Sequence, residues 1–129
     1  MLSWPQRRRI RHAIRRAEAG TTGHVAVRVV RDADVDPFAR ATAEFETAGL
    51  HRAEHRNAAL ILVAPRARRF AVIGDAALHQ RVGPAFWDEV VARVQPAFAD
   101  GKFADGIERA IESIGEQFHA HFAKKAQAG

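Results

Sequence analysis

The sequence predicts a three-layer α/β/α sandwich, in which helices cover a mixed, mainly parallel central sheet that includes one antiparallel hairpin strand. Three observations predict this fold class. The apolar run Ala58–Ala64 has the length and composition of a buried strand. A second run, Arg69–Gly74, follows it after a short turn, so that the two form a hairpin. An alternating, Val-rich run at residues 24–30 precedes both across a helical pattern, which favours a right-handed crossover and a parallel pair.

The first helix is expected to begin directly after Ser3. The Ser3 hydroxyl can accept a hydrogen bond from the first turn while Gln6 reaches back to the backbone, an arrangement called a capping box. The apolar residues that follow recur at helical spacing until the chain reaches Gly20. These apolar residues are Trp4, Ile10, Ala13, Ile14 and Ala17.

Three further helices are expected along the chain. One covers residues 37–48 and is closed by Gly49, and another begins at Pro84. The last helix carries apolar residues spaced by four, four, three, four and four positions, which form one continuous stripe. The stripe consists of Phe103, Ile107, Ile111, Ile114, Phe118 and Phe122. Four helices packed on the sheet complete the layered domain.

Length and composition indicate one domain that spans residues 1–129. A chain of 129 residues is long enough to bury a core without covalent cross-links. It contains no Cys, which excludes disulfides, thiolate metal sites and a cysteine nucleophile. No apolar stretch approaches the roughly 20 residues of a membrane helix, and the early arginines do not fit a secretory signal. We therefore expect a soluble, cytoplasmic protein.

The chain is basic, with 17 arginines, 3 lysines and a net charge of +5. The first predicted helix holds six of the arginines against one acid, Glu18: Arg7, Arg8, Arg9, Arg11, Arg15 and Arg16. Such a face suits an anionic protein or membrane surface. The alternative is a helix that packs its apolar side on the sheet and leaves the arginines in water. Nucleic acid is not favoured as a partner, because no aromatic-basic stacking motif accompanies the arginines.

Polar residues gather at the edge where the three predicted strands begin or end. Folding the hairpin brings Asp75 beside Arg56 and Asn57, because the outer ends of a hairpin meet. A parallel pairing of the first two strands adds the start of the first strand to the same edge. The predicted ligand-binding set is therefore Thr21, Thr22, His24, Arg56, Asn57 and Asp75.

Two interpretations of this cluster stay open. In the functional one, Asp75 ligates a cation or orients water while Arg56 neutralises a phosphate. In the structural one, Arg56 pairs with Asp75, Asp75 caps a turn after the third strand, and Asn57 braces the loop. The cluster supplies one carboxylate, which is fewer than a metal-assisted hydrolase usually brings together.

A zinc-peptidase pattern, H-x-x-E-H, occurs at His51, Glu54 and His55. That chemistry needs both imidazoles on one face of a helix, with the carboxylate beside them as a general base. Here the segment follows the helix-closing Gly49 and immediately precedes a strand, so we expect a short connection and no zinc site. The sequence contains no phosphate-binding glycine loop and no nucleophile elbow.

Several separated segments together resemble the small soluble branch of the TPM domain family, which includes thylakoid lumen and photosystem II repair proteins. The matching segments are Ile10-x-x-Ala13-Ile14-x-x-Ala17-Glu18, Thr22-Gly23, Asp36-Pro37, Arg56-Asn57, Phe70-Ala-Val-Ile-Gly74-Asp75, Trp87, Phe98-x-x-Gly101, Gly106-Ile107 and Ile114-Gly115. The resemblance implies an α/β/α sandwich. It also implies either an accessory role in the assembly or repair of membrane proteins or an acid phosphatase activity, with calcium or another divalent ion bound by acidic residues.

The chain departs from the family pattern near the predicted site. His24 stands where the family usually has Glu, Ala58 replaces a Gly, and Ala53 replaces a Thr. Calcium takes about six to eight oxygen ligands, so the loss of an acid weakens an inherited calcium site. An imidazole beside a carboxylate suits zinc or nickel better, which makes His24 and Asp75 the metal candidates.

The expected function is that of a non-enzymatic accessory or binding module. It would bind an unidentified protein partner of a membrane-associated complex through its basic surface. The alternative is a weak phosphatase assisted by a divalent metal ion at the strand edge around Asp75. A divalent ion is the only cofactor that the residues suggest.

Overall fold

The computed structural model describes residues 2–125, which form five α-helices and three strands. The helices are α1 (Trp4–Glu18), α2 (Pro37–Thr47), α3 (Ala76–Val82), α4 (Pro84–Ala99) and α5 (Phe103–His121). The strands are β1 (His24–Val29), β2 (Ala58–Ala64) and β3 (Arg69–Gly74). Short 3₁₀ turns, Leu50–Arg52 and Pro65–Ala67, precede and follow β2.

The sheet has the order β1-β2-β3, with β1 parallel and β3 antiparallel to β2. His24 is paired with Ala58, and Ala59 is paired with Gly74. The predicted mixed sheet, crossover and hairpin are confirmed, but the expectation of a mainly parallel sheet is wrong. The crossover connection gives one parallel pair of strands, and the hairpin gives one antiparallel pair, so neither direction predominates.

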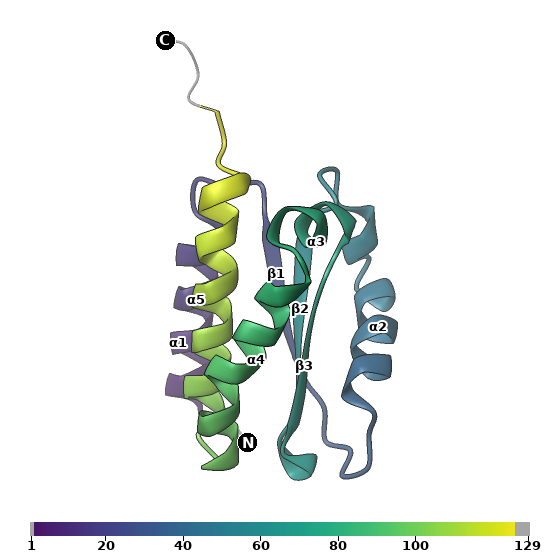
Figure 1. Cartoon of the computed structure of the whole chain (residues 1–129). Coiled ribbons are helices and arrows are strands. Elements are labelled where there is room, and N and C mark those ends of the chain that lie inside the picture. Colours follow the sequence, from purple (N-terminus) through teal and green to yellow (C-terminus); the bar gives the residue numbers. More distant parts are fainter. Residues whose placement is uncertain (1, 126–129) are drawn as a thin grey trace.

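Helices lie on both faces of the sheet (Figure 1). The helices α1, α4 and α5 cover one face and α2 covers the other, so that β2 is buried along its whole length. Its side chains alternate between two cores, because successive residues of a strand point to opposite faces. Ala59, Ile61 and Val63 enter the larger core, whereas Leu60 and Leu62 enter the core beneath α2.

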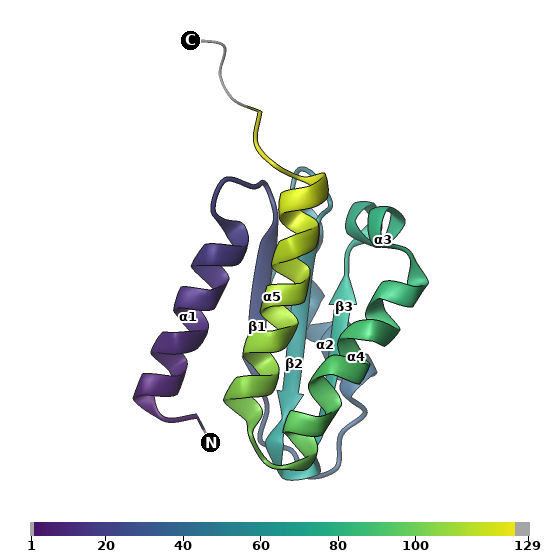
Figure 2. The same cartoon turned by 60° about the vertical axis from the view of Figure 1, so that its left-hand side comes forward.

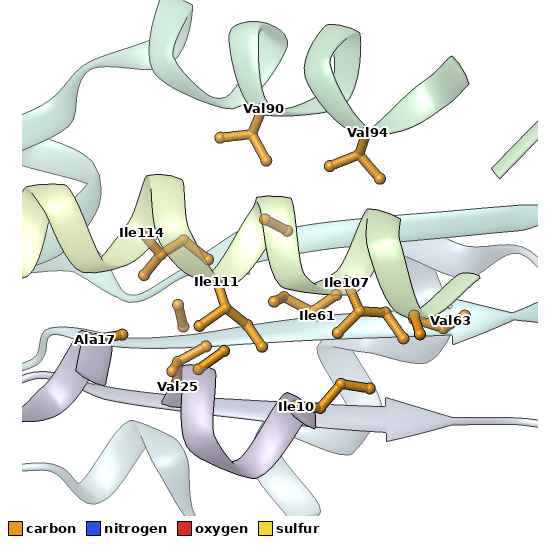
Figure 3. Packing of buried hydrophobic residues seen from close by; sticks show 14 of the residues in the cluster. Ile10, Ala17, Val25, Ile61, Val63, Val90, Val94, Ile107, Ile111 and Ile114 are labelled. Carbon is orange, nitrogen blue, oxygen red and sulfur yellow. The ribbon is translucent and has the colours of Figure 1, made fainter. Parts of the chain in front are cut away.

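The last helix is the centre of the larger core. Figure 2 shows α5 between α1 and α4, and Figure 3 shows Ile107, Ile111 and Ile114 directed into the packed layer between helices and sheet. These three residues and Phe118 are completely buried. The predicted apolar stripe is therefore confirmed, except that Phe122 lies one position beyond the end of the helix.

The sequence predicts four helices, and five are present among the described residues. The additional helix, α3, is not predicted because its apolar pattern is short and weak. Its first turn is held from outside the helix. The Asp75 carboxylate accepts a hydrogen bond from Ala76 N–H at 2.8 Å, and the Arg56 carbonyl accepts one from Ala77 N–H at 3.0 Å. The remote Arg56 carbonyl could not be recognised as a cap from local sequence.

The predicted start of α1 is confirmed. Gln6 N–H donates to Ser3 Oγ at 3.2 Å, and Ser3 N–H donates to Gln6 Oε1 at 2.7 Å, which completes the capping box. Among residues 2–125, no helix combines the length and the apolar character that a bilayer crossing requires.

Candidate functional site

The six predicted residues do meet at one edge of the sheet, where β1 and β2 begin and β3 ends. This edge is at the top of Figure 1, beside α3. The register sets His24 next to Ala58, and Asp75 N–H donates to the Ala58 carbonyl at 2.9 Å. The residues nevertheless divide into two groups with different environments.

Arg56 and Asp75 form a closed ion pair. Arg56 Nε lies 2.7 Å from Asp75 Oδ2, and an Arg56 Nη lies 2.8 Å from Asp75 Oδ1. Such two-point hydrogen bonding between a guanidinium and a carboxylate fixes both charge and orientation. These bonds from Arg56 lower the pKa of Asp75 below its ordinary value of 3.8, although burial of the carboxylate opposes the shift. Both oxygens of Asp75 are therefore already engaged.

The backbone of Arg56 joins the same arrangement. Arg56 has a left-handed conformation, with φ of 50°, which is uncommon for a residue with a side chain. In this conformation its N–H donates to the Ala53 carbonyl, while its own carbonyl accepts from the start of α3. The predicted structural interpretation of Arg56 and Asp75, a pair and a cap, is what the structure contains.

Asn57 belongs to the second group and is completely buried. Its Nδ2 donates to Thr22 Oγ1 at 2.9 Å, but its Oδ1 has no hydrogen-bond partner among the described residues. Thr21 is satisfied locally, because its hydroxyl donates to the Glu18 carbonyl and accepts from Gly23 N–H. Burial of an amide oxygen without a partner is costly, so the Oδ1 of Asn57 is a position where a donor or a cation would be stabilised.

A pocket of about 250 Å³ lies beside Asn57. It is lined by Thr21, Thr22, His24, Ala53, Glu54, His55, Asn57 and Lys124. Arg56 and Asp75 are not part of this lining, so the predicted metal pair of His24 and Asp75 does not share one cavity. Across residues 2–125, no group of three or more His, Cys, Asp or Glu side chains is arranged to hold a metal ion.

Four lining residues lie outside the predicted set, namely Ala53, Glu54, His55 and Lys124. Glu54 and His55 belong to the H-x-x-E-H pattern, and the segment that carries it is a short connection, a 3₁₀ turn followed by a second turn, as expected. Lys124 reaches the pocket because Thr21 and Ala123 form an antiparallel bridge. This contact joins opposite ends of the chain, and no local sequence pattern signals it.

The arginines of α1 also divide into two groups. Arg9 forms ion pairs with Asp105 and Glu108 of α5, and Arg16 lies 3.8 Å from Glu108. The remaining four are exposed and have no ion-pair partner among the described residues: Arg7, Arg8, Arg11 and Arg15. The unpaired arginines leave part of α1 strongly cationic.

A groove of about 570 Å³ runs between α1 and β1. It is here called the basic groove, and its lining consists of Leu2, Arg7, Ile10, Arg11, Ile14, Val25, Ala26, Val27, Arg28, Val29 and Arg31. Apolar side chains form most of this lining, and arginines come from both walls. Among residues 2–125 no acidic side chain lines the groove.

Comparison with known proteins gives one family match, which covers nearly the whole chain. The TPM domain matches residues 1–117. The NMR structure of the BA42 protein from the psychrophilic bacterium Bizionia argentinensis is 30% identical, with a TM-score of 0.87 over 97% of this chain and 86% of that chain. A search of curated proteins found no match.

Two more distant structures share the fold. The N-terminal domain of the cg2496 protein from Corynebacterium glutamicum is 17% identical, with a TM-score of 0.75 over 100% of this chain and 82% of that chain. The N-terminal domain of a protein from P. gingivalis is 14% identical, with a TM-score of 0.79 over 98% of this chain and 83% of that chain. The family match and the BA42 structure confirm the resemblance, and the chain belongs to the TPM domain family.

Proposed function

We propose that this chain is a non-enzymatic accessory module that binds a protein of a membrane-associated complex through its arginine-rich surface. The observation that carries the proposal is the basic groove, whose lining includes four arginines from α1 and the β1 segment: Arg7, Arg11, Arg28 and Arg31. None of the four has an ion-pair partner among residues 2–125. Cations gathered without counter-charges attract an anionic partner and steer its approach.

The state of the strand edge supports a binding function over a catalytic one. Asp75 is the carboxylate that hydrolysis would use, and both of its oxygens accept hydrogen bonds from within the chain. Arg56 would have to release this carboxylate before Asp75 could ligate a metal or position water. A preorganised catalytic centre holds its acid free for the substrate or metal.

In-cell photo-crosslinking tests the proposal. A photoreactive residue replaces either Arg11 in the basic groove or Arg81, a matched exposed arginine of α3. The helix α3 lies on the other side of α5 from α1 (Figure 2). Illumination of the native cell should give a discrete protein adduct in the membrane fraction from the first variant and little from the second. Equal adducts from both variants, or none from the groove, would contradict the proposal.

A second candidate function, a weak metal-assisted phosphatase, is favoured by one observation at the other pocket. Asn57, whose Oδ1 has no hydrogen-bond partner among residues 2–125, lines the same pocket as two imidazoles, His24 and His55, and one exposed carboxylate, Glu54. This mixed nitrogen and oxygen set suits zinc or nickel better than calcium, which needs more oxygen ligands. In such a site His24 and Asn57 would hold the ion, which would polarise a phosphate oxygen.

Titration calorimetry with zinc and calcium tests this second candidate. Wild type should prefer zinc, and His24→Glu should shift the preference toward calcium, because a carboxylate restores a hard oxygen ligand. Hydrolysis of p-nitrophenyl phosphate is then measured with the preferred ion, for wild type and for His24→Ala, which removes a proposed ligand from the pocket. Brisk metal-dependent hydrolysis that His24→Ala abolishes would move the assignment from accessory module to enzyme.

A further inference from the structure

β1 is an edge strand of the sheet, and its outer side borders the basic groove. The direction of its backbone groups follows from two hydrogen bonds. Val30 N–H donates to the Val63 carbonyl in β2, whereas Val25 N–H turns away from β2 and donates to Glu18 Oε2 at 2.8 Å. Because alternate residues of a strand point their backbone groups to the same side, Val27 and Val29 also present N–H and carbonyl groups outward.

The outer edge is covered at one end and open at the other. At the start of β1, Glu18 accepts from Val25 N–H, and the chain after α5 pairs with the residues that lead into the strand. Further along, the Val27 carbonyl accepts from the exposed Arg28 side chain at 3.2 Å. A flexible side chain of this kind can be displaced. Val29 is 38% exposed although it is a large apolar residue.

Unpaired strand edges are templates for an added strand, and exposed ones are usually protected. Here Arg28 supplies a charge at the edge, while the neighbouring groove offers apolar contacts from Ile10, Ile14 and Val27. A strand laid along β1 would place alternate side chains against these contacts. The remaining side chains would lie on the opposite face of the sheet, to which Arg28 belongs because it alternates with Val27 and Val29.

We propose that the open edge at residues 27–31 accepts an extended, acidic segment of a partner protein as a fourth strand. This inference rests on the proposed accessory function and names the chemistry of its partner. Apolar side chains of the segment fill the groove between α1 and β1, and acidic ones on the opposite side of the segment pair with Arg28. Arg7, Arg11 and Arg31 add to the positive field that attracts an acidic segment. The outward N–H and carbonyl groups of Val27 and Val29 supply the backbone hydrogen bonds.

The charge pattern favours this occupant over the two alternatives. A second copy of the chain paired through β1 would bring the same arginines against each other without acids between them, which is repulsive. An anionic lipid could satisfy the arginines and fill a groove of this size. It would leave the outward N–H groups of Val27 and Val29 unpaired and buried, which an extended peptide would not.

The test uses purified full-length protein and a short, end-blocked peptide of alternating Val and Glu. Amide NMR should show that this peptide shifts Val27 and Val29 and slows their exchange with solvent, whereas Val72 on the outer side of β3 stays unchanged. A version of the peptide that is methylated on the backbone nitrogens along one of its edges should bind about tenfold more weakly, because it loses two or more hydrogen bonds. A copy with Lys in place of Glu should not bind.

Two protein variants test the same backbone hydrogen bonds by changing β1 instead of the peptide. Val29→Pro removes one outward N–H at an edge position that tolerates Pro, and Val29→Ala keeps the N–H while it trims the exposed side chain. Pro should weaken peptide binding about tenfold and Ala about twofold or less. The methylated peptide on wild-type protein decides the question if Val29→Pro does not fold.

Equal binding of the methylated and unmethylated peptides would overturn the strand addition. Tight binding of oleate or phosphatidylglycerol vesicles, without binding of the peptide, would overturn it in favour of a lipid. In either case a photo-crosslinked protein adduct at Arg11 would leave the proposed accessory function standing. Loss of both the adduct and the peptide binding would remove both proposals.

Discussion

Arg56 and Asp75 are 19 positions apart in the sequence, yet two hydrogen bonds of 2.7 and 2.8 Å join their side chains. The pair links the start of β2 to the start of α3, because Asp75 also caps that helix and the Arg56 carbonyl accepts from Ala77 N–H. The carboxylate is buried, and its partner is half exposed. This relationship gives the edge cluster a structural task that is independent of any ligand.

Replacement of Asp75 should therefore lower stability without any ligand present. Asp75→Ala should reduce the free energy of unfolding by about 1–3 kcal/mol, because it removes a helix cap and both bonds to Arg56. Asp75→Asn should cost less, since an amide still caps the helix. Urea denaturation measures both. Asp32→Ala, which breaks an exposed pair with Arg40, is the control and should change stability by less than about 1 kcal/mol.

The same pair predicts a pH dependence. Folding lowers the pKa of Asp75 below its ordinary value of 3.8, so the ionised carboxylate favours the folded state above that value. This contribution is lost as the pH falls through the folded pKa. The stability difference between wild type and Asp75→Asn should thus be constant near neutral pH and shrink below about pH 4. A difference that grows in acid would contradict this assignment.

The buried stripe of α5 should dominate the stability of the domain. Ile111→Ala and Phe118→Ala should each lower the free energy of unfolding by about 2–5 kcal/mol, because each leaves a cavity in a completely buried layer. Glu116→Ala on the exposed side of the same helix should change it by less than about 0.5 kcal/mol. Unchanged denaturation midpoints in both core variants would show that α5 is peripheral.

Close approach of α1 and α5 depends on Gly115. A Cβ at this position would lie 2.8 Å from the Ala17 Cβ and 2.9 Å from the Ala17 Cα, and a backbone atom cannot rotate away. Gly115→Ala should lower the free energy of unfolding by about 1–3 kcal/mol, as overpacking of a core does. Thermal or urea denaturation of Glu116→Ala and Glu116→Gly, at an exposed position of the same helix, measures the helix-propensity difference between Gly and Ala and so separates it from this steric effect. A stabilised Gly115→Ala protein would contradict the packing described.

The sequence predicts which residues meet at the strand edge. It does not predict that they divide into a closed Arg56–Asp75 ion pair and a separate pocket beside Asn57. Hydrophobic patterning and a short turn were enough to pair β2 with β3 and so to bring Asp75 to Arg56. The division arises from non-local features: α3 starts at once after Asp75, and Arg56 adopts a left-handed backbone. Neither is encoded by a periodic pattern, so an open metal pair of His24 and Asp75 could be expected where the structure has a closed ion pair.

The fold was more predictable than the site because burial on two faces leaves a strong signal. The wholly apolar β2 and the stripe of α5 both follow directly from it. The basic groove could be foreseen only in part. The arginines of α1 were visible, but Arg28 and Arg31 join them only because α1 packs beside the edge strand. The bridge between Thr21 and Ala123, which brings Lys124 to the second pocket, was likewise non-local.

The most direct measurement places a photoreactive residue at the exposed Trp4 of α1 and compares adduct yield in three backgrounds in the native cell. The first background carries no change other than the photoreactive residue. The second replaces the four groove arginines with Gln: Arg7, Arg11, Arg28 and Arg31. The third makes the same change at four exposed arginines outside the groove: Arg52, Arg69, Arg81 and Arg109. Both variants lose the same charge, so binding through the groove predicts that the protein adduct disappears only in the second background. Adducts that persist in all three backgrounds, or that fall equally in both variants, would contradict it.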